Sequence, residues 1–221
     1  MVIAIDGPGG VGKSTVTRRL ATILGVDFLD TGATYRAATV AALESGADLA
    51  DEAAVLAAVT ARDIAYEDGV ILLDGRSIAV ETRSEAVTQA VTPVSAFPSV
   101  REHVVHIQRD WVADRGGDAV VEGRDIGTVV FPDAPVKVFL TADASIRAAR
   151  RSGDAEAANL AVSEIVADLN RRDHADSTRE TSPLRPADDA VEIDTGAMSV
   201  DEVVATILGL IAGANAVSPG G

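Results

Sequence analysis

The segment 7–15, GPGGVGKST, concentrates four glycines and one of the chain's two lysines in nine residues. It fits the pattern G-x-x-x-x-G-K-[ST], in which glycines let backbone N–H groups converge on phosphate oxygens without clashes from Cβ atoms. Lys13 can then reach the β- and γ-phosphates of a nucleoside triphosphate, and the Ser14 hydroxyl can bind Mg²⁺. The predicted ligands of the nucleoside triphosphate are Gly7, Pro8, Gly9, Gly10, Val11, Gly12, Lys13, Ser14 and Thr15.

Such a loop needs a strand before it and a helix after it, and the sequence predicts both. Residues 2–6 form a short apolar run typical of a buried strand, and 13–24 favour a helix that ends at Gly25. Further short apolar runs lie at 26–30, 119–121, 136–140 and 191–193. Helical segments separate most of them, which predicts a parallel sheet with helices on both faces.

Residues 63–82 have a different pattern. Two Asp-Gly pairs, at 68–69 and 74–75, lie between β-branched runs, and such pairs are a strong signal for hairpin turns. They predict a small antiparallel insert over about 62–92. On either side of it we expect helices at 35–45, 51–60 and 99–113, the last capped by Ser99 and lined by Val100, Val104, Ile107 and Trp111.

The composition restricts the classes of function. A net charge of −15 argues against a nucleic acid polymer as partner, and the absence of cysteine excludes a disulfide framework and a Cys-type zinc site. No apolar run approaches the ~18 residues of a membrane span. The first apolar run gives way at once to Asp6 and the glycines, unlike a signal peptide. We therefore expect a cytoplasmic protein without a membrane partner, and a monomer, because no coiled-coil pattern appears.

Arginine is unevenly distributed along the chain. Residues 147–185 hold seven arginines and seven acidic residues, so this stretch is neutral and the rest of the chain carries the whole net charge. A neutral, arginine-rich stretch suits a small anionic ligand. It is also typical of an exposed helix with alternating charges, and the charge pattern alone favours this second interpretation.

The phosphate-binding loop is shared by switch GTPases, motor ATPases and small-molecule kinases. The chain has no N-K-x-D guanine motif, and its nearest match to the acidic strand of a motor, DAVVEGRDIG at 118–127, is poor. Arg36 and Arg124 each follow a predicted strand, where ligands of such sheets bind. These two arginines favour a kinase whose second substrate carries a phosphate.

Five segments then follow one another in a familiar order and spacing: IDGPGGVGKST, LDTGATYR, FPSVRE, EGRDIGTVVFPDAPVKVFL and NRRDHADSTRE. Over residues 2 to about 210 the chain resembles the bacterial cytidylate (CMP) kinases, of the nucleoside monophosphate kinase family of P-loop proteins. The resemblance implies an α/β fold with a five-stranded parallel sheet flanked by helices, a small antiparallel insert in the monophosphate-binding region and a helical lid. It implies a single domain over 1–211, with core 1–61 and 93–211, insert about 62–92, lid about 150–180, and a disordered tail at 212–221.

The resemblance also implies the reaction, in which ATP donates its γ-phosphoryl group to CMP, and to dCMP, in pyrimidine nucleotide metabolism. The implied ligands of the CMP phosphate are Arg36, Arg101, Arg124 and Arg179. The implied readers of cytosine are Thr92, Arg101 and Asp125, and those of the sugar are Arg172 and Asp176. Arg150 and Arg151 would begin the lid that closes over ATP, and the implied catalytic residues are Lys13, Arg124, Arg179 and Arg150. Thr31 stands where many members carry serine and would supply a hydroxyl to the substrate, whereas Thr34 takes a position that is usually apolar.

Cytosine reading at Asp125 makes chemical sense, because a carboxylate accepts from the cytosine amino group but would face the O4 oxygen of uracil. Two alternatives remain open. One is a different small-molecule kinase, such as a UMP, dTMP or shikimate kinase, and the other is a nucleotide-gated binding module without an acceptor.

Overall fold

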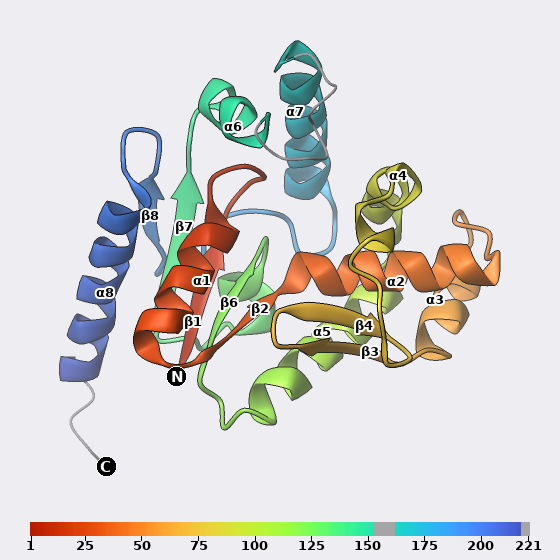
Figure 1. The fold of residues 1–221 in the computed structure, drawn as a ribbon, viewed down its shortest axis with the longest axis horizontal. Coiled ribbons are helices and arrows are strands. Elements are labelled where there is room, and N and C mark those ends of the chain that lie inside the picture. The colour runs from red at the N-terminus through yellow and green to blue at the C-terminus, as the bar shows by residue number, and fades with distance from the viewer. Residues whose placement is uncertain (153–161, 218–221) are drawn as a thin grey trace. The chain divides into compact units, whose positions relative to one another are not determined.

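The structure, a computed structural model, describes residues 1–152 and 162–217, with the elements labelled in Figure 1. It divides into two compact units. Unit 1 comprises Met1–Phe28 and Gly117–Gly221, and unit 2 comprises Leu29–Gly116. The phosphate-binding loop belongs to unit 1, and the predicted antiparallel insert belongs to unit 2.

A five-stranded parallel sheet with the order β2-β6-β1-β7-β8 confirms the predicted fold class. Its strands are β1 (Val2–Asp6), β2 (Asp27–Asp30), β6 (Ala119–Gly123), β7 (Val136–Thr141) and β8 (Val191–Asp194). β1 pairs in parallel with β6 and β7, and this register places Asp6 opposite Gly123 at the carboxyl ends of β1 and β6. The glycine loop and Arg124, which follow these two strands, therefore start at neighbouring positions.

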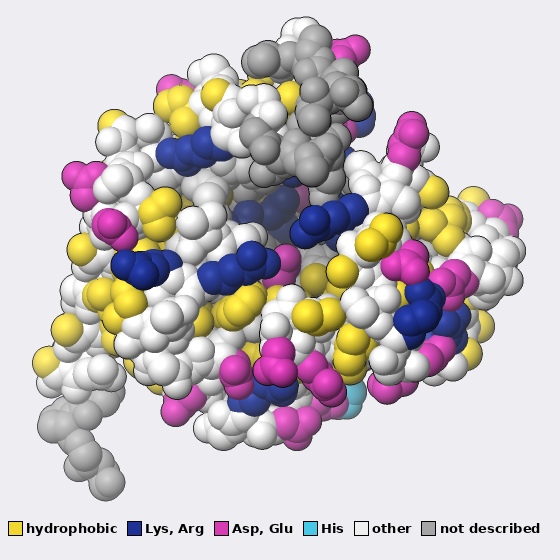
Figure 2. Space-filling view, in the orientation of Figure 1, with side chains coloured by type: hydrophobic (Ala, Val, Ile, Leu, Met, Phe, Trp, Pro, Cys, Tyr) yellow, Lys and Arg dark blue, Asp and Glu magenta, His cyan; other side chains and the backbone are white. Residues whose placement is uncertain are grey.

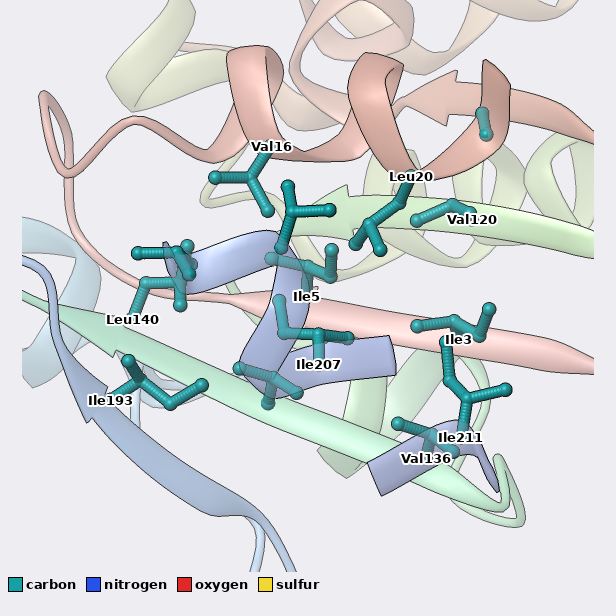
Figure 3. Close-up of a cluster of buried hydrophobic side chains, with 14 of the residues drawn as sticks. Ile3, Ile5, Val16, Leu20, Val120, Val136, Leu140, Ile193, Ile207 and Ile211 are labelled. Carbon is teal, nitrogen blue, oxygen red and sulfur yellow. The ribbon is translucent and has the colours of Figure 1, made fainter. Parts of the chain in front are cut away.

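The core of unit 1 lies between the sheet and two helices, α1 (Lys13–Leu24) and α8 (Val200–Val217). Figure 3 shows side chains that meet there, among them Ile3, Ile5, Val16, Leu20, Ile207 and Ile211. Burying each such side chain stabilises the fold by about 1.5–3 kcal/mol. This packing fixes the position of α1, whose first turn follows the glycine loop. As predicted, α1 ends at Gly25, which adopts the left-handed conformation with φ 68°.

Helix α8 continues beyond the predicted start of a disordered tail at 212. Ile211 is buried in the core and Ala214 packs against it, and the alanines in this stretch favour a helix. Residues 212–217 are helical, so the tail prediction was wrong for them. Residues 218–221 of the predicted tail and 153–161 of the predicted lid lie outside the described residues. The described ends of the predicted lid belong to α6 (Ala144–Arg151) and α7 (Val162–Thr178).

Unit 2 contains the predicted antiparallel sheet, formed by β3 (Ile64–Glu67), β4 (Val70–Leu73) and β5 (Arg76–Ser77). Both Asp-Gly pairs make the turns, with positive φ at all four residues. The sheet is confirmed but ends at Ser77. The rest of the predicted insert holds a 3₁₀ turn, Glu81–Arg83, and helix α4 (Glu85–Val94), which begins where the Ser84 hydroxyl accepts from the Val87 N–H at 3.3 Å.

Three further helices complete unit 2: α2 (Thr31–Ser45), α3 (Glu52–Thr60) and α5 (Pro98–Ala113). α2 begins four residues earlier than predicted, because the Asp30 carboxylate accepts from the Ala33 N–H and caps it. The predicted cap at Ser99 was wrong. Proline at the first position starts α5, and the Ser99 N–H and hydroxyl both donate to Glu52, at 2.8 and 2.7 Å.

Oppositely charged side chains meet on the surface of unit 2. We call this group the surface network, and its members are Glu44, Arg62, Asp74, Arg76 and Glu81. Arg62 and Arg76 donate to the two oxygens of Glu44 at 3.0 and 2.7 Å. Figure 2 shows acidic and basic side chains side by side on one face of the molecule.

No helix in the described part of the chain combines the length and the apolar character that crossing a membrane would require.

Candidate active site

The glycine loop joins β1 to α1 and follows a path that other residues could not take. Gly7 has φ 145°, and a Cβ atom there would lie 2.3 Å from the Leu140 carbonyl oxygen. Gly10 has φ 81°, and its Cβ atom would lie 3.0 Å from the Arg147 Cβ atom. Glycine is therefore required at these two positions to bring the loop backbone against its neighbours.

Lys13 lies folded over this loop at the start of α1. Its ammonium group donates to the Gly7 and Pro8 carbonyl oxygens, each at 2.8 Å, and the side chain is largely buried. Ser14 and Thr15 follow it in the first turn of α1 and are exposed. The lysine predicted to bind phosphates is thus held beside the loop amides.

A buried carboxylate accompanies Ser14. The Ser14 hydroxyl donates to Glu122 Oε2 at 3.1 Å, and Glu122 is only 3% exposed. A hydroxyl and a carboxylate are the kinds of oxygen ligand that Mg²⁺ prefers. Within residues 1–152 and 162–217 no three acidic or histidine side chains gather as a metal site. Ser14 and Glu122 are thus residues that could contribute oxygen ligands to a Mg²⁺ ion.

Asp6, the last residue of β1, ties the loop strand to the segment after Arg124. Its carboxylate accepts from the Ile126 and Gly127 N–H groups, each at 2.8 Å. Burial raises the pKa of this carboxyl to about 6, and the charge of Asp125 also raises it, although the two backbone hydrogen bonds and Lys13 oppose the shift. Asp6 thereby holds the backbone next to Asp125 in place.

Four predicted substrate residues of unit 1 form one cluster: Arg124, Asp125, Asp176 and Arg179. Arg124 pairs with Asp176 at 2.9 Å and donates to the Gly7 carbonyl oxygen at 3.0 Å. The Arg179 guanidinium lies 3.6 Å from a carboxylate oxygen of Asp176 and 3.9 Å from one of Asp125. The structure therefore connects these residues to the glycine loop.

The remaining predicted arginines of unit 1 lie on α6 and α7. Arg150 donates to the Val11 carbonyl oxygen at 3.2 Å and to the Thr195 hydroxyl and carbonyl oxygens at 2.9 and 2.7 Å. Arg151 follows it and is half-buried. Arg172 pairs with Asp168 at 3.0 Å, one turn before it on α7. Arg150 thus contacts the glycine loop directly, whereas Arg172 is held along α7.

Unit 2 carries the other predicted substrate residues. Arg101 is buried, donates to the Ser95 carbonyl oxygen at 3.0 Å and lies over the Tyr35 ring, 4.9 Å from its centre. Arg36 donates to the Thr82 carbonyl oxygen at 2.8 Å. Thr92 is half-buried on α4, and its carbonyl oxygen accepts from the Ser95 hydroxyl at 3.1 Å. Arg101 and Thr92 therefore both connect to Ser95.

Thr34, whose polarity the sequence did not explain, has a structural role. Its hydroxyl donates to the Thr31 carbonyl oxygen and accepts from the Gln108 amide, both at 2.8 Å. All three residues are buried in unit 2. A threonine here satisfies buried polar groups and fixes the first turn of α2, where Thr31 lies.

Sequence reasoning missed several residues that contact the loop region: Asp6, Glu122, Arg147 and Asp173. Asp6 and Glu122 had a usable signal, since each is an acid at the carboxyl end of an apolar strand. Arg147 and Asp173 had none beyond their place in the neutral, arginine-rich stretch.

Comparison with known proteins identifies the family of this chain. The family model described as "Cytidylate kinase" matches residues 3–213. The chain belongs to the cytidylate kinase family. The cytidylate kinase of Rhodococcus opacus (strain B4) is 50% identical over 216 residues, covering 94% of this chain and 93% of that protein. The cytidylate kinase of Mycobacterium leprae (strain Br4923) is 48% identical over 213 residues, covering 96% and 95%. The resemblance inferred from the five segments is thereby confirmed.

Among solved structures, this cytidylate kinase family member resembles the crystal structure of an uncharacterized protein from Eubacterium ventriosum ATCC 27560. The TM-score is 0.51 over 96% of this chain and 98% of the other, with 13% sequence identity. At that identity the similarity concerns the fold alone.

Proposed function

We infer that this chain is an ATP-dependent cytidylate kinase, which transfers the γ-phosphoryl group of ATP to CMP and forms CDP and ADP. The observation that carries this conclusion is a phosphate-binding loop within a chain that matches the cytidylate kinase family over residues 3–213. We further propose that dCMP is an acceptor and that the enzyme acts as a cytoplasmic monomer.

The proposed mechanism depends on placement and charge, because the acceptor phosphate is already anionic at neutral pH and needs no strong base. Lys13 would exchange the Gly7 and Pro8 carbonyl oxygens for the β- and γ-phosphates of ATP. Arg124 and Arg179 would align the CMP phosphate with the γ-phosphoryl group. Their contacts with Asp176 support this role, since a carboxylate shared by two arginines holds both guanidinium groups in a defined orientation.

Ser14 and Glu122 are the residues proposed to hold Mg²⁺. Magnesium, when bound, supplies positive charge that neutralises the phosphate oxygens. The hydrogen bond from Ser14 to Glu122 supports the assignment, because it orients the hydroxyl oxygen beside a carboxylate. Glu122 would keep the hydroxyl in that orientation.

The match to the cytidylate kinase family supports the ligands that we propose for CMP. The proposed ligands of its phosphate are Arg36, Arg101, Arg124 and Arg179, and Thr31 would add a hydroxyl. The proposed readers of the base are Thr92, Arg101 and Asp125, and those of the sugar are Arg172 and Asp176. Arg150 and Arg151 would lie at the start of a lid of about 150–180 that closes over ATP and excludes water. The contact of Arg150 with the Val11 carbonyl oxygen supports this placement.

An acceptor panel tests the function. ADP release from ATP is measured by a coupled assay with CMP, dCMP, UMP, dTMP and shikimate as acceptors, and with no acceptor. We expect turnover to depend on an acceptor and to be fastest with CMP. A preference for UMP, dTMP or shikimate would replace the assignment with another kinase, and nucleotide binding without acceptor-dependent turnover would indicate a binding module.

Asp125→Ala tests how the base is read. We expect the ratio of kcat/KM for CMP to that for UMP to fall about tenfold or more, because the variant loses the acceptor for the cytosine amino group. Asp133→Ala is the matched control, since Asp133 is exposed, and it should leave the ratio unchanged. An unchanged ratio in a folded Asp125→Ala enzyme would remove Asp125 from base reading.

A further inference from the structure

One carboxylate from α7 reaches the glycine loop of unit 1. The Gly9 N–H donates to Asp173 Oδ1 at 3.4 Å. The Arg147 guanidinium donates to Asp173 Oδ2 and also to the Gly9 carbonyl oxygen, the latter at 3.0 Å. Both polar groups of Gly9 therefore contact a single Arg–Asp pair.

Packing holds this carboxylate in place. Leu169, one turn before Asp173 on α7, lies so close to the loop that a Cβ atom on Gly9 would be 3.2 Å from its Cδ2 atom. Leu169 belongs to a buried cluster with Ile165 and Ala148, which joins α7 to α6. The Arg147 side chain is 8% exposed and that of Asp173 is 20% exposed. The contact is therefore part of the packed structure of unit 1.

The groups around the Asp173 carboxylate are those that a phosphate oxygen would use. A loop N–H and a guanidinium are donors for a phosphate of ATP, and a carboxylate oxygen is an acceptor of the same kind. Both anions cannot occupy one place, and their negative charges repel each other. At 3.4 Å the hydrogen bond from the Gly9 N–H to the carboxylate is long, so losing this bond costs little when a phosphate oxygen takes its place.

We propose that Asp173 is an internal competitor of the ATP phosphates, which occupies the anion-binding position formed by the Gly9 N–H and Arg147 and lowers the affinity for ATP. This proposal rests on the proposed use of the loop for ATP binding. When the triphosphate binds, Asp173 gives up the Gly9 N–H, and Arg147 exchanges its carboxylate partner for a phosphate oxygen.

A purely supporting role for Asp173 makes the opposite prediction. If the carboxylate served to orient Arg147 toward ATP, removing its charge would loosen the arginine and weaken ATP binding. The sign of the change in affinity therefore separates a competitor from a positioning residue.

The test is the dissociation constant for ATP, measured by isothermal titration calorimetry on the full chain without acceptor. Asp173→Asn keeps the shape of the side chain and an oxygen for the Gly9 N–H but removes the charge. We expect ATP to bind about tenfold more tightly, because one like charge beside the phosphates is gone. Unchanged or weaker binding by the folded variant would overturn the proposal.

Two controls sharpen this test. Asp201→Asn removes the same charge from α8, where the side chain is 85% exposed, and it should leave the dissociation constant unchanged. Inorganic tripolyphosphate should show the same gain as ATP with Asp173→Asn, because the position recognises phosphate and not adenine. A gain confined to ATP would contradict the proposal.

Asp173→Ser is a second variant without the charge, for use if circular dichroism shows that Asp173→Asn does not fold. The same gain in affinity for ATP is expected. Failure of the wild-type chain to bind ATP would count against the proposed function itself. ATP binding by the wild type without a gain in the folded variants would count against the competitor role of Asp173 alone.

Discussion

Two groups of Arg–acid pairs in this molecule use the same chemistry in different surroundings. The surface network of unit 2 is exposed, as shown by the Arg76 side chain, which is 49% exposed. The pairs Arg124–Asp176 and Arg147–Asp173 of unit 1 are more buried, and both arginines also donate to carbonyl oxygens of the glycine loop. Exposed pairs contribute about 0–1 kcal/mol each, because water and salt screen them. In the proposed mechanism the pairs at the loop hold cations beside the phosphates of ATP, so we expect them to affect ligand binding as well as stability.

The largest effect on activity is expected from Lys13, whose ammonium group lies over the glycine loop. Lys13→Ala should lower kcat with ATP and CMP by about a hundredfold or more, because the ammonium that stabilises the transferred phosphoryl group is lost. Steady-state ADP release measures kcat, and thermal unfolding shows whether the variant is folded. A folded variant with near-normal kcat would refute the proposed role of Lys13.

A smaller effect, on stability and dependent on pH, is expected from Asp6, the buried last residue of β1. Its pKa is raised from 3.8 to about 6 in the folded protein, so the folded state binds this proton more tightly than the unfolded state. The destabilisation from Asp6 is therefore fully present above pH ~6 and disappears as the pH falls toward ~4.

Asp6→Asn removes this titration, and urea unfolding of both proteins measures it. The free energy of unfolding of the wild type, relative to the variant, should rise by up to about 3 kcal/mol as the pH falls from 7 to 4. The comparison cancels groups that titrate alike in both proteins. Parallel pH profiles would show that burial does not shift the pKa of Asp6.

The smallest effect is expected in the surface network. Arg76→Ala should lower the free energy of unfolding only slightly, because its partners Glu44 and Glu81 stay hydrated. Urea unfolding measures this change, and kcat and the dissociation constant for ATP should match the wild type. A loss of several kcal/mol would mean that the exposed pairs are as important as those at the loop.

Features encoded by neighbouring residues were predicted well from the sequence. The glycine loop, the end of α1 at Gly25 and the two Asp-Gly turns each depend on a backbone conformation that glycine adopts easily. The start of α5 was missed because Pro98 determines it and Ser99 instead bonds Glu52, far away in the sequence. The last turns of α8 were missed because packing of Ile211 extends a helix that composition alone leaves ambiguous.

The same distinction between local patterns and distant contacts applies to the candidate site. The loop residues were identified from a contiguous motif. Arg36 and Arg124 were identified from their positions after strands, and the other substrate arginines came from the family resemblance. Glu122 beside Ser14 and Asp173 beside Gly9 are contacts between residues 108 and 164 positions apart. Local patterns carry no information about such pairs, so only the folded arrangement reveals them.

The most direct measurement follows the transferred group itself. ATP labelled in its γ-phosphoryl group is incubated with the enzyme and CMP, and the products are separated by chromatography. We expect the label to appear in CDP in proportion to the ADP formed. Label released only as inorganic phosphate, at a rate that CMP does not change, would contradict this expectation.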